Sequence, residues 1–173
     1  MRIDIRTLGA LEIALDGQPA GQLPAKAQAL LVYLAITNRA HSRSALAGLL
    51  WGEMPEERAR ANLRLALTSL RSRLGDILQA NRSEVGIAPG IDVICDANRL
   101  TALAARDEPE LDEARAALET YRGEFLASFE AGDALEFEEW MLAERERLSQ
   151  AALSLGLRLA GRLVERGALQ DAR

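Results

Sequence analysis

One arginine-framed helical stripe, between residues 58 and 78, constrains this chain more than any other feature. The segment RARANLRLALTSLRSRLGDIL spaces its apolar side chains alternately by four and three residues, which aligns them on one face of a helix. They are Leu63, Leu67, Leu70, Leu74 and Ile77. The surrounding arginines are Arg58, Arg60, Arg64, Arg71 and Arg73. Such a helix is a candidate for insertion into a DNA groove, although most basic amphipathic helices are merely solvated on their polar face.

Length and composition indicate a globular protein of one domain or two small ones. The chain has 173 residues, of which 49% are hydrophobic and 27% are charged. A single cysteine, Cys95, excludes a disulfide framework. No apolar run approaches the length of a membrane span, and the N-terminus lacks a signal-peptide core. We therefore expect a cytoplasmic protein without a membrane partner.

Charge divides the chain into two unlike halves. Residues 1–90 hold 11 Lys and Arg against 8 Asp and Glu, whereas residues 91–173 hold 10 against 18. The overall net charge of −5 therefore hides a mildly basic first half and a strongly acidic second half. This asymmetry predicts a basic module joined to an acidic one.

The first half has the element order of a winged helix. Alternating residues at 2–7 and 11–15, with a tight turn at Asp16-Gly17, predict a short antiparallel sheet. Helical spacing then predicts a helix from Ala25 to about Asn38, and a second that is capped by Ser42 and ends at Trp51-Gly52.

Proline and glycine mark the remaining boundaries of this half. Pro55 suits the first turn of the arginine helix, which is the third helix in the chain. Short alternating runs on either side of Pro89-Gly90 predict a hairpin that closes the unit near residue 96. The fold class is therefore α+β, with an N-terminal β-sheet, three helices and a C-terminal hairpin over residues 1–96.

The second half, residues 97–173, is predicted to be all helical. Helices are expected at 98–106, at 109–121 and at 135–165, where Gly167 stops the last one. Leu169 would then begin another helix. Antiparallel helix pairs of this length are the unit of tetratricopeptide-like arrays, and one exposed pair cannot close such an array. We therefore expect the helical domain to be truncated and the chain to be a fragment of a longer protein.

The residues of the first half resemble the OmpR-type winged-helix DNA-binding domain at the N-terminus of bacterial AfsR/SARP-type activators. The matching segments are LGALEIALDGQP, LPAKAQALLVYLA, SRSALAGLLWGEMPEERARANLRLALTSLRSRLG and IDVICDA. The second half is similar to the bacterial transcriptional activation domain that follows in that family. That match rests on ALETYRGEFLASFEAGDALEFEEWMLAERERL.

The resemblance implies a transcriptional activator that binds direct repeats in double-stranded DNA near promoters. It also implies a contact between RNA polymerase and the loop after the second helix, where Glu53 and Met54 lie. A homodimer on DNA or through the helical domain is a further expectation, because two copies on adjacent repeats would offset the weak binding of one.

Within the arginine helix, a rotation of 100° per residue directs Leu65 away from the buried stripe. An outward leucine can meet thymine methyl groups in a major groove, or it can pack on the hairpin or remain exposed. The predicted base-contacting residues are Asn62, Arg64, Leu65, Thr68 and Ser69. The predicted phosphate-contacting residues are Arg43, Arg58, Arg60, Arg71 and Arg73.

The sequence offers little support for an enzyme. It contains no phosphate-binding glycine loop, zinc-protease motif or nucleophile elbow. The only histidine, His41, lacks neighbours at metal-ligand spacing. We therefore expect neither an enzyme nor a bound metal or cofactor. The alternative to a DNA-binding regulator is an interaction adaptor that works through the acidic helical half and does not bind DNA.

Overall fold

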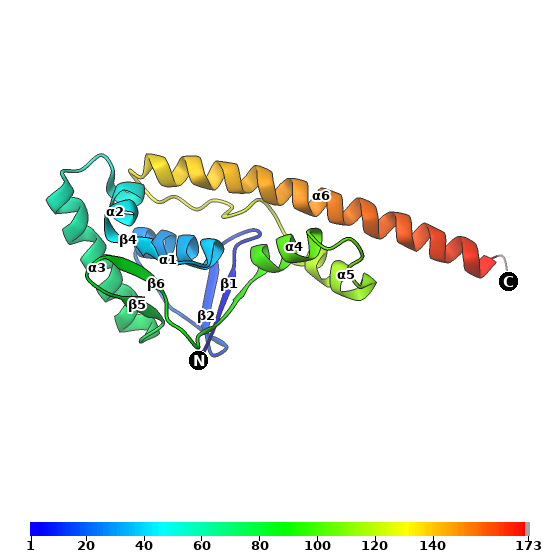
Figure 1. The fold of residues 1–173 in the computed structure, drawn as a ribbon, viewed down its shortest axis with the longest axis horizontal. Coiled ribbons are helices and arrows are strands. Elements are labelled where there is room, and N and C mark those ends of the chain that lie inside the picture. The colour runs from blue at the N-terminus through cyan, green and yellow to red at the C-terminus, as the bar shows by residue number, and fades with distance from the viewer. Residues whose placement is uncertain (172–173) are drawn as a thin grey trace.

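The computed structural model describes residues 1–171, which form a mixed α/β N-terminal part followed by a helical C-terminal part (Figure 1). The strands are β1 (Arg2–Arg6), β2 (Glu12–Leu15), β3 (Gln18–Pro19), β4 (His41–Ser42), β5 (Leu78–Ala80), β6 (Glu84–Ile87) and β7 (Asp92–Cys95). The helices are α1 (Ala25–Thr37), α2 (Arg43–Trp51), α3 (Glu56–Leu74), α4 (Asp96–Ala104), α5 (Leu111–Glu119) and α6 (Leu135–Asp171). No helix within residues 1–171 is both long enough and apolar enough to cross a membrane.

The predicted N-terminal sheet is confirmed, and it gains one strand from later in the chain. Its order is β3-β2-β1-β7, with β1 and β2 antiparallel in the register Ile3 to Leu15. Asp16 and Gly17 join β2 to β3 with φ angles of 47° and 81°, the left-handed conformation that a two-residue hairpin turn requires. β7 lies parallel to β1 on the other side.

The predicted hairpin around Pro89-Gly90 is wrong. β6 pairs with β4 and β5, whereas β7 pairs with β1 in the other sheet, so Pro89-Gly90 connects two sheets. The hairpin that exists is β5–β6. Its turn is closed by the Asn81 side chain, whose Oδ1 accepts hydrogen bonds from the backbone N–H groups of Ser83 and Glu84, both at 2.8 Å.

Three helices follow the first sheet as predicted, with one difference at the end of the third. The Ser42 Oγ caps α2 by accepting a hydrogen bond from the Ala45 N–H at 3.1 Å. α3 stops at Gly75, which has a φ of 69°. Ile77 is buried but lies beyond the helix, so its predicted place on the helical stripe is wrong.

The C-terminal part contains the expected helices but not the expected helix end. α4 and α5 start and end within two residues of their predicted bounds. α6 runs for 37 residues to Asp171, so the predicted stop at Gly167 and the new helix from Leu169 are wrong. A glycine inside a helix costs about 1 kcal/mol relative to alanine, and it ends the helix only where the backbone turns left-handed.

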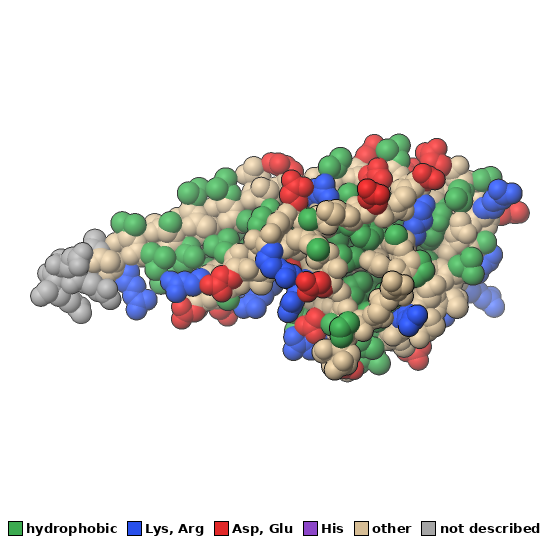
Figure 2. Space-filling view, turned by 180° about the vertical axis from the view of Figure 1, so that it is seen from behind, with side chains coloured by type: hydrophobic (Ala, Val, Ile, Leu, Met, Phe, Trp, Pro, Cys, Tyr) green, Lys and Arg blue, Asp and Glu red, His purple; other side chains and the backbone are tan. Residues whose placement is uncertain are grey.

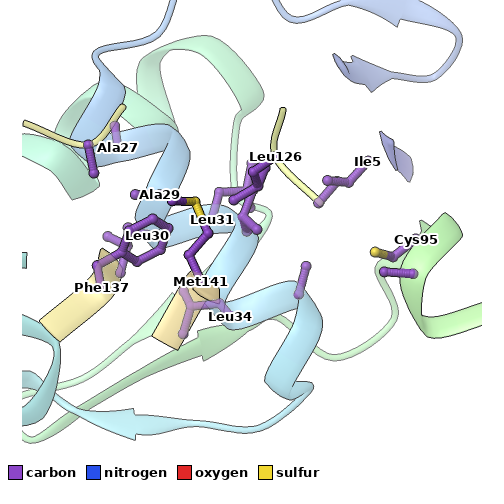
Figure 3. Packing of buried hydrophobic residues seen from close by; sticks show 14 of the residues in the cluster. Ile5, Ala27, Ala29, Leu30, Leu31, Leu34, Cys95, Leu126, Phe137 and Met141 are labelled. Carbon is purple, nitrogen blue, oxygen red and sulfur yellow. The ribbon is translucent and has the colours of Figure 1, made fainter. Parts of the chain in front are cut away.

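The two parts share one hydrophobic core. Phe137 and Met141 of α6 lie beside Leu30 and Leu34 of α1 (Figure 3). Tyr33 of α1 packs edge-on against Trp140 of α6, with ring centroids 4.9 Å apart. α6 therefore covers the N-terminal part with its first turns and projects away from it beyond α4 and α5 (Figure 1).

Candidate nucleic-acid interface

α3 presents one buried face and one open face at the edge of the molecule (Figure 1). Its buried residues are Ala59, Leu63, Ala66, Leu67, Leu70 and Leu74. Glu56 and Glu57 lie in the first turn, and Arg71 and Arg73 lie in the last, which suits the helix dipole at both ends. The residues on the open face of α3 do not pack in the core, so they are available to bind a partner.

An open groove of about 960 Å³ runs between α3 and the β5–β6 hairpin. Five arginines line it, and its lining residues include no aspartate or glutamate. The arginines are Arg43, Arg60, Arg64, Arg71 and Arg82. One of them, Arg60, pairs with Glu56, which lies outside the groove lining. A groove lined by guanidinium groups and no carboxylates is a site for a polyanion such as a phosphate backbone.

Hydrogen bonds from Arg43, the first residue of α2, fix the position of the β5–β6 hairpin turn. The Arg43 Nε donates to the Asn81 carbonyl at 2.8 Å, and the Arg43 backbone N–H donates to the Ser83 carbonyl at 2.8 Å. These bonds attach the hairpin turn to the start of α2. As a result, Arg82 at the tip of the turn lies on the groove opposite Arg64 and Arg71 of α3.

The predicted base-contacting residues fall in three places. Arg64 and Thr68 line the groove, and Leu65 is 66% exposed on the open ridge of α3. Asn62 and Ser69 are half-buried and do not line the groove. The Asn62 amide Nδ2 donates to Met54 Sδ at 3.3 Å, so Asn62 contacts the loop between α2 and α3.

The predicted phosphate-contacting arginines divide in the same way. Arg43, Arg60 and Arg71 line the groove, whereas Arg58 and Arg73 are exposed outside it. The Arg60 guanidinium also forms an ion pair with Glu56 at 2.5 Å.

Arg82 lines the groove but is not among the predicted contact residues. Its signal in the sequence is the Asn81-Arg82-Ser83 turn, which joins β5 to β6. The predicted hairpin at Pro89-Gly90 left that turn without a role.

The loop that holds Glu53 and Met54 is exposed and lies beside the start of α6. A Cβ at Gly52 would lie 2.5 Å from the Glu136 carboxylate, which shows that the loop after α2 lies against the first turn of α6. The ammonium group of Lys26 donates to the carbonyls of Leu50 at 2.7 Å and Asp133 at 2.8 Å. The end of α2 is thereby tied to the segment that enters α6.

Ligands for a metal do not gather in the part of the chain that the structure describes. No group of three or more His, Cys, Asp and Glu side chains is placed there to hold an ion. His41 is buried, and its Nε2 lies 2.7 Å from the Thr37 Oγ1. Burial, with a smaller contribution from Arg39, lowers the pKa of His41.

Comparison with known proteins shows similarity to the transcriptional regulatory protein EmbR. No protein-family model matches the chain. It is 32% identical over 141 residues to the transcriptional regulatory protein EmbR of Mycobacterium tuberculosis and to that of Mycobacterium bovis. The match covers 72% of this chain and 36% of EmbR, so the chain spans about a third of the length of these relatives.

A solved structure agrees with the sequence match. It is Mycobacterium tuberculosis EmbR in complex with a low affinity phosphopeptide, with a TM-score of 0.64 and 28% sequence identity. The similarity covers 99% of this chain and 50% of that chain, so it includes both the α/β part and the helical part.

Proposed function

Because the chain is homologous to EmbR and belongs to the AfsR/SARP-type transcriptional regulators, we propose that it binds promoter DNA and activates transcription. In this proposal residues 1–96 are an OmpR-type winged helix, with α3 as the recognition helix and β5–β6 as the wing. Residues 97–173 are a tetratricopeptide-like activation domain. The partners are double-stranded DNA and RNA polymerase in the cytoplasm, and the protein is not an enzyme.

The observation that carries the proposal is the arginine-lined groove between α3 and the hairpin. The chain as a whole has a net charge of −5, so a local cluster of five arginines, of which one (Arg60) pairs with a glutamate, is not explained by composition. A helix that lies in the major groove of DNA, with a hairpin turn over the adjacent backbone, places cations where these arginines lie.

The proposed DNA contacts form two groups, one in the arginine-lined groove and one on the open face of α3. Arg43, Arg60, Arg71 and Arg82 bind phosphates and set the position of the protein on DNA. Leu65 on the ridge contacts thymine methyl groups, and Arg64 between ridge and groove forms a bidentate contact with guanine. Each base contact should contribute about 1–3 kcal/mol of discrimination between sequences.

The remaining predicted residues have supporting roles. Thr68 and Ser69 reach bases or phosphates one turn further along α3. Asn62 keeps its proposed contact with adenine only if its hydrogen bond to Met54 is exchanged on binding. Arg58 and Arg73, which are exposed outside the groove, contact more distant phosphates.

We assign the polymerase contact to the exposed loop with Glu53 and Met54. This loop lies beside the start of α6, so the proposed activation surface is continuous with the helical domain. Pull-down of RNA polymerase should weaken in a Glu53→Ala, Met54→Ala double variant that still binds DNA. An unchanged pull-down would remove this contact from the proposal.

Selection of bound sequences from a random DNA pool tests the whole proposal. Enrichment of one motif, present as a direct repeat, supports it. Failure to retain any DNA at low salt would instead favour the alternative function of an interaction adaptor.

Fluorescence anisotropy with the selected site then tests the division of roles. Arg64→Ala and Leu65→Glu should relax sequence preference. Arg82→Ala should weaken binding to all sequences and reduce the slope of log K against log salt by about 0.9. Arg106→Ala is the matched control, because Arg106 is exposed far from the groove and pairs with Glu113. Equal losses in the control and groove variants would contradict the proposed interface.

A further inference from the structure

A cavity of about 360 Å³ lies where the N-terminal sheet meets the helical part of the chain. Residues of β1 and β7, the first turn of α4 and the end of α5 form its walls, and α4 lies beside β1 (Figure 1). The proposed DNA interface is a different hollow, between α3 and the β5–β6 hairpin. Small-molecule sites commonly have volumes of about 300–1,000 Å³. The cavity is therefore large enough for a small ligand, and the proposed function does not use it.

Charged side chains of both signs gather at this junction. Figure 2 shows arginine side chains next to acidic ones near the middle of one face, where α6 projects from the body. Several of those that line the cavity are paired. The Arg2 guanidinium binds the Asp4 carboxylate at 2.6 Å. Arg6 and Arg122 share the carboxylate of Glu12, at 3.1 Å and 3.4 Å.

Two charged side chains of the cavity have no such partner, Arg99 of α4 and Glu119 of α5. The remaining carboxylate, that of Asp96, accepts hydrogen bonds from the Thr7 hydroxyl and from neighbouring backbone N–H groups. Within residues 1–171, neither Arg99 nor Glu119 forms an ion pair or a side-chain hydrogen bond, and both are exposed. They are therefore further apart than the roughly 4 Å of an ion pair. The cavity presents a cation and an anion that do not neutralise each other directly.

The position of Glu119 favours a cation beside it. Glu119 is the last residue of α5, at the negative end of the helix dipole, where a carboxylate is disfavoured and a cation is stabilised. The next residue, Thr120, also lines the cavity. Its hydroxyl donates to the Ala117 carbonyl at 2.6 Å, so the lone pairs of the hydroxyl oxygen remain able to accept. The end of α5 is therefore an acceptor site for an ammonium group.

The cavity also has an apolar wall and a balanced charge. Ile94 of β7 lines it and is 37% exposed, on a sheet face that is otherwise mostly charged. The four arginines of the lining are matched by its three carboxylates together with that of Glu12. This balance differs from the arginine-lined groove, and it favours a ligand with no net charge over a polyanion.

We propose that this cavity binds a small zwitterion, an α-amino acid with an apolar side chain. The Arg99 guanidinium binds the ligand carboxylate through two N–H donors. The Glu119 carboxylate and the Thr120 hydroxyl oxygen accept from the ligand ammonium group. The ligand side chain covers Ile94. Because the two charged contacts lie close to solvent, we expect a dissociation constant of about 1 mM.

Isothermal titration calorimetry with leucine, valine, methionine and phenylalanine tests the proposal. At least one of the four should bind. Its N-acetyl derivative lacks the ammonium group and its amide lacks the carboxylate, so each should bind about tenfold more weakly. Absence of binding by all four at about ten times the expected dissociation constant would overturn the proposal. Equal binding of the N-acetyl derivative would also overturn it, because the site would then recognise an anion alone.

Variants locate the ligand in the cavity. Arg99→Gln and Glu119→Gln should each weaken binding about tenfold. In Glu119→Gln, the amino acid and its N-acetyl derivative should bind equally, since the ammonium group has lost its partner. Arg115→Gln and Asp112→Asn are the matched controls, because both residues are exposed on α5 and neither lines the cavity.

Unchanged binding in both cavity variants, or equal losses in the controls, would overturn the assignment of the ligand to this cavity. Unchanged circular dichroism spectra of the variants confirm that they are folded. These measurements need no DNA, so their failure is distinguishable from a failure of the proposed DNA binding.

Discussion

The carboxylate of Asp96 is the buried polar group whose removal should affect stability most. It is 8% exposed at the start of α4, where the α/β part passes into the helical part. It accepts hydrogen bonds of 2.8–3.0 Å from four donors: the Thr7 N–H, the Thr7 hydroxyl, the Leu8 N–H and the Ala97 N–H. One side chain thus satisfies backbone groups from two segments that are about ninety residues apart.

Asp96→Ala leaves three backbone N–H groups without this acceptor. Each buried donor that loses its partner costs about 1–3 kcal/mol, and water entering the space left by the carboxylate recovers part of that amount. We therefore expect the free energy of unfolding to fall by about 3–5 kcal/mol. Thr7→Val, which removes only the hydroxyl donor, should reduce it by about 1 kcal/mol.

Urea unfolding followed by tryptophan fluorescence and circular dichroism measures these changes. Asp92→Ala is the matched control, because Asp92 is exposed on β7 four residues away and should change stability by less than about 0.5 kcal/mol. A loss for Asp96→Ala as small as that of the control would show that these hydrogen bonds do not stabilise the fold.

Three further predictions concern His41, Cys95 and Lys26. Burial lowers the pKa of His41 below 6.5, so the unfolded chain gains its proton first as the pH falls, and unfolding free energy should decrease from about pH 6.5 downward. His41→Gln should remove that decrease in urea titrations at several pH values, and an unchanged pH profile would contradict it. Burial also raises the pKa of the Cys95 thiol, so Ellman's reagent should react far more slowly with native than with urea-unfolded protein; equal rates would contradict this. Lys26→Met keeps the apolar part of the side chain but removes the hydrogen bonds to the carbonyls of Leu50 and Asp133. The free energy of unfolding should fall by about 1–3 kcal/mol. No change would show that water replaces the ammonium group at those carbonyls.

The elements themselves were largely predictable because their signals are local. Hydrophobic spacing placed α1, α2 and α3, and the hydroxyl of Ser42 caps α2 as its position suggested. The same holds for Asp16-Gly17, where two left-handed residues are needed and Gly tolerates that conformation best. The outward direction of Leu65 also follows from helical rotation alone.

Strand pairing could not be predicted in the same way. The alternation of apolar residues in β6 and β7 is genuine, but alternation does not state which strand is the neighbour. β7 pairs with β1, which lies about ninety residues earlier in the chain. The local turn signal at Pro89-Gly90 therefore pointed to the wrong partner strand. The predicted DNA contacts omit Arg82 for the same reason. Arg82 lines the groove because β5 and β6 form the hairpin.

Most helices and strands, and the residues of α3 that face outward, could be predicted because those properties depend on spacing and on backbone preferences within a few residues. Which arginines share a groove, and why Asp96 is buried, became evident only from the three-dimensional arrangement. These properties depend on contacts between residues far apart in the chain, and the local spacing of residues does not specify those contacts.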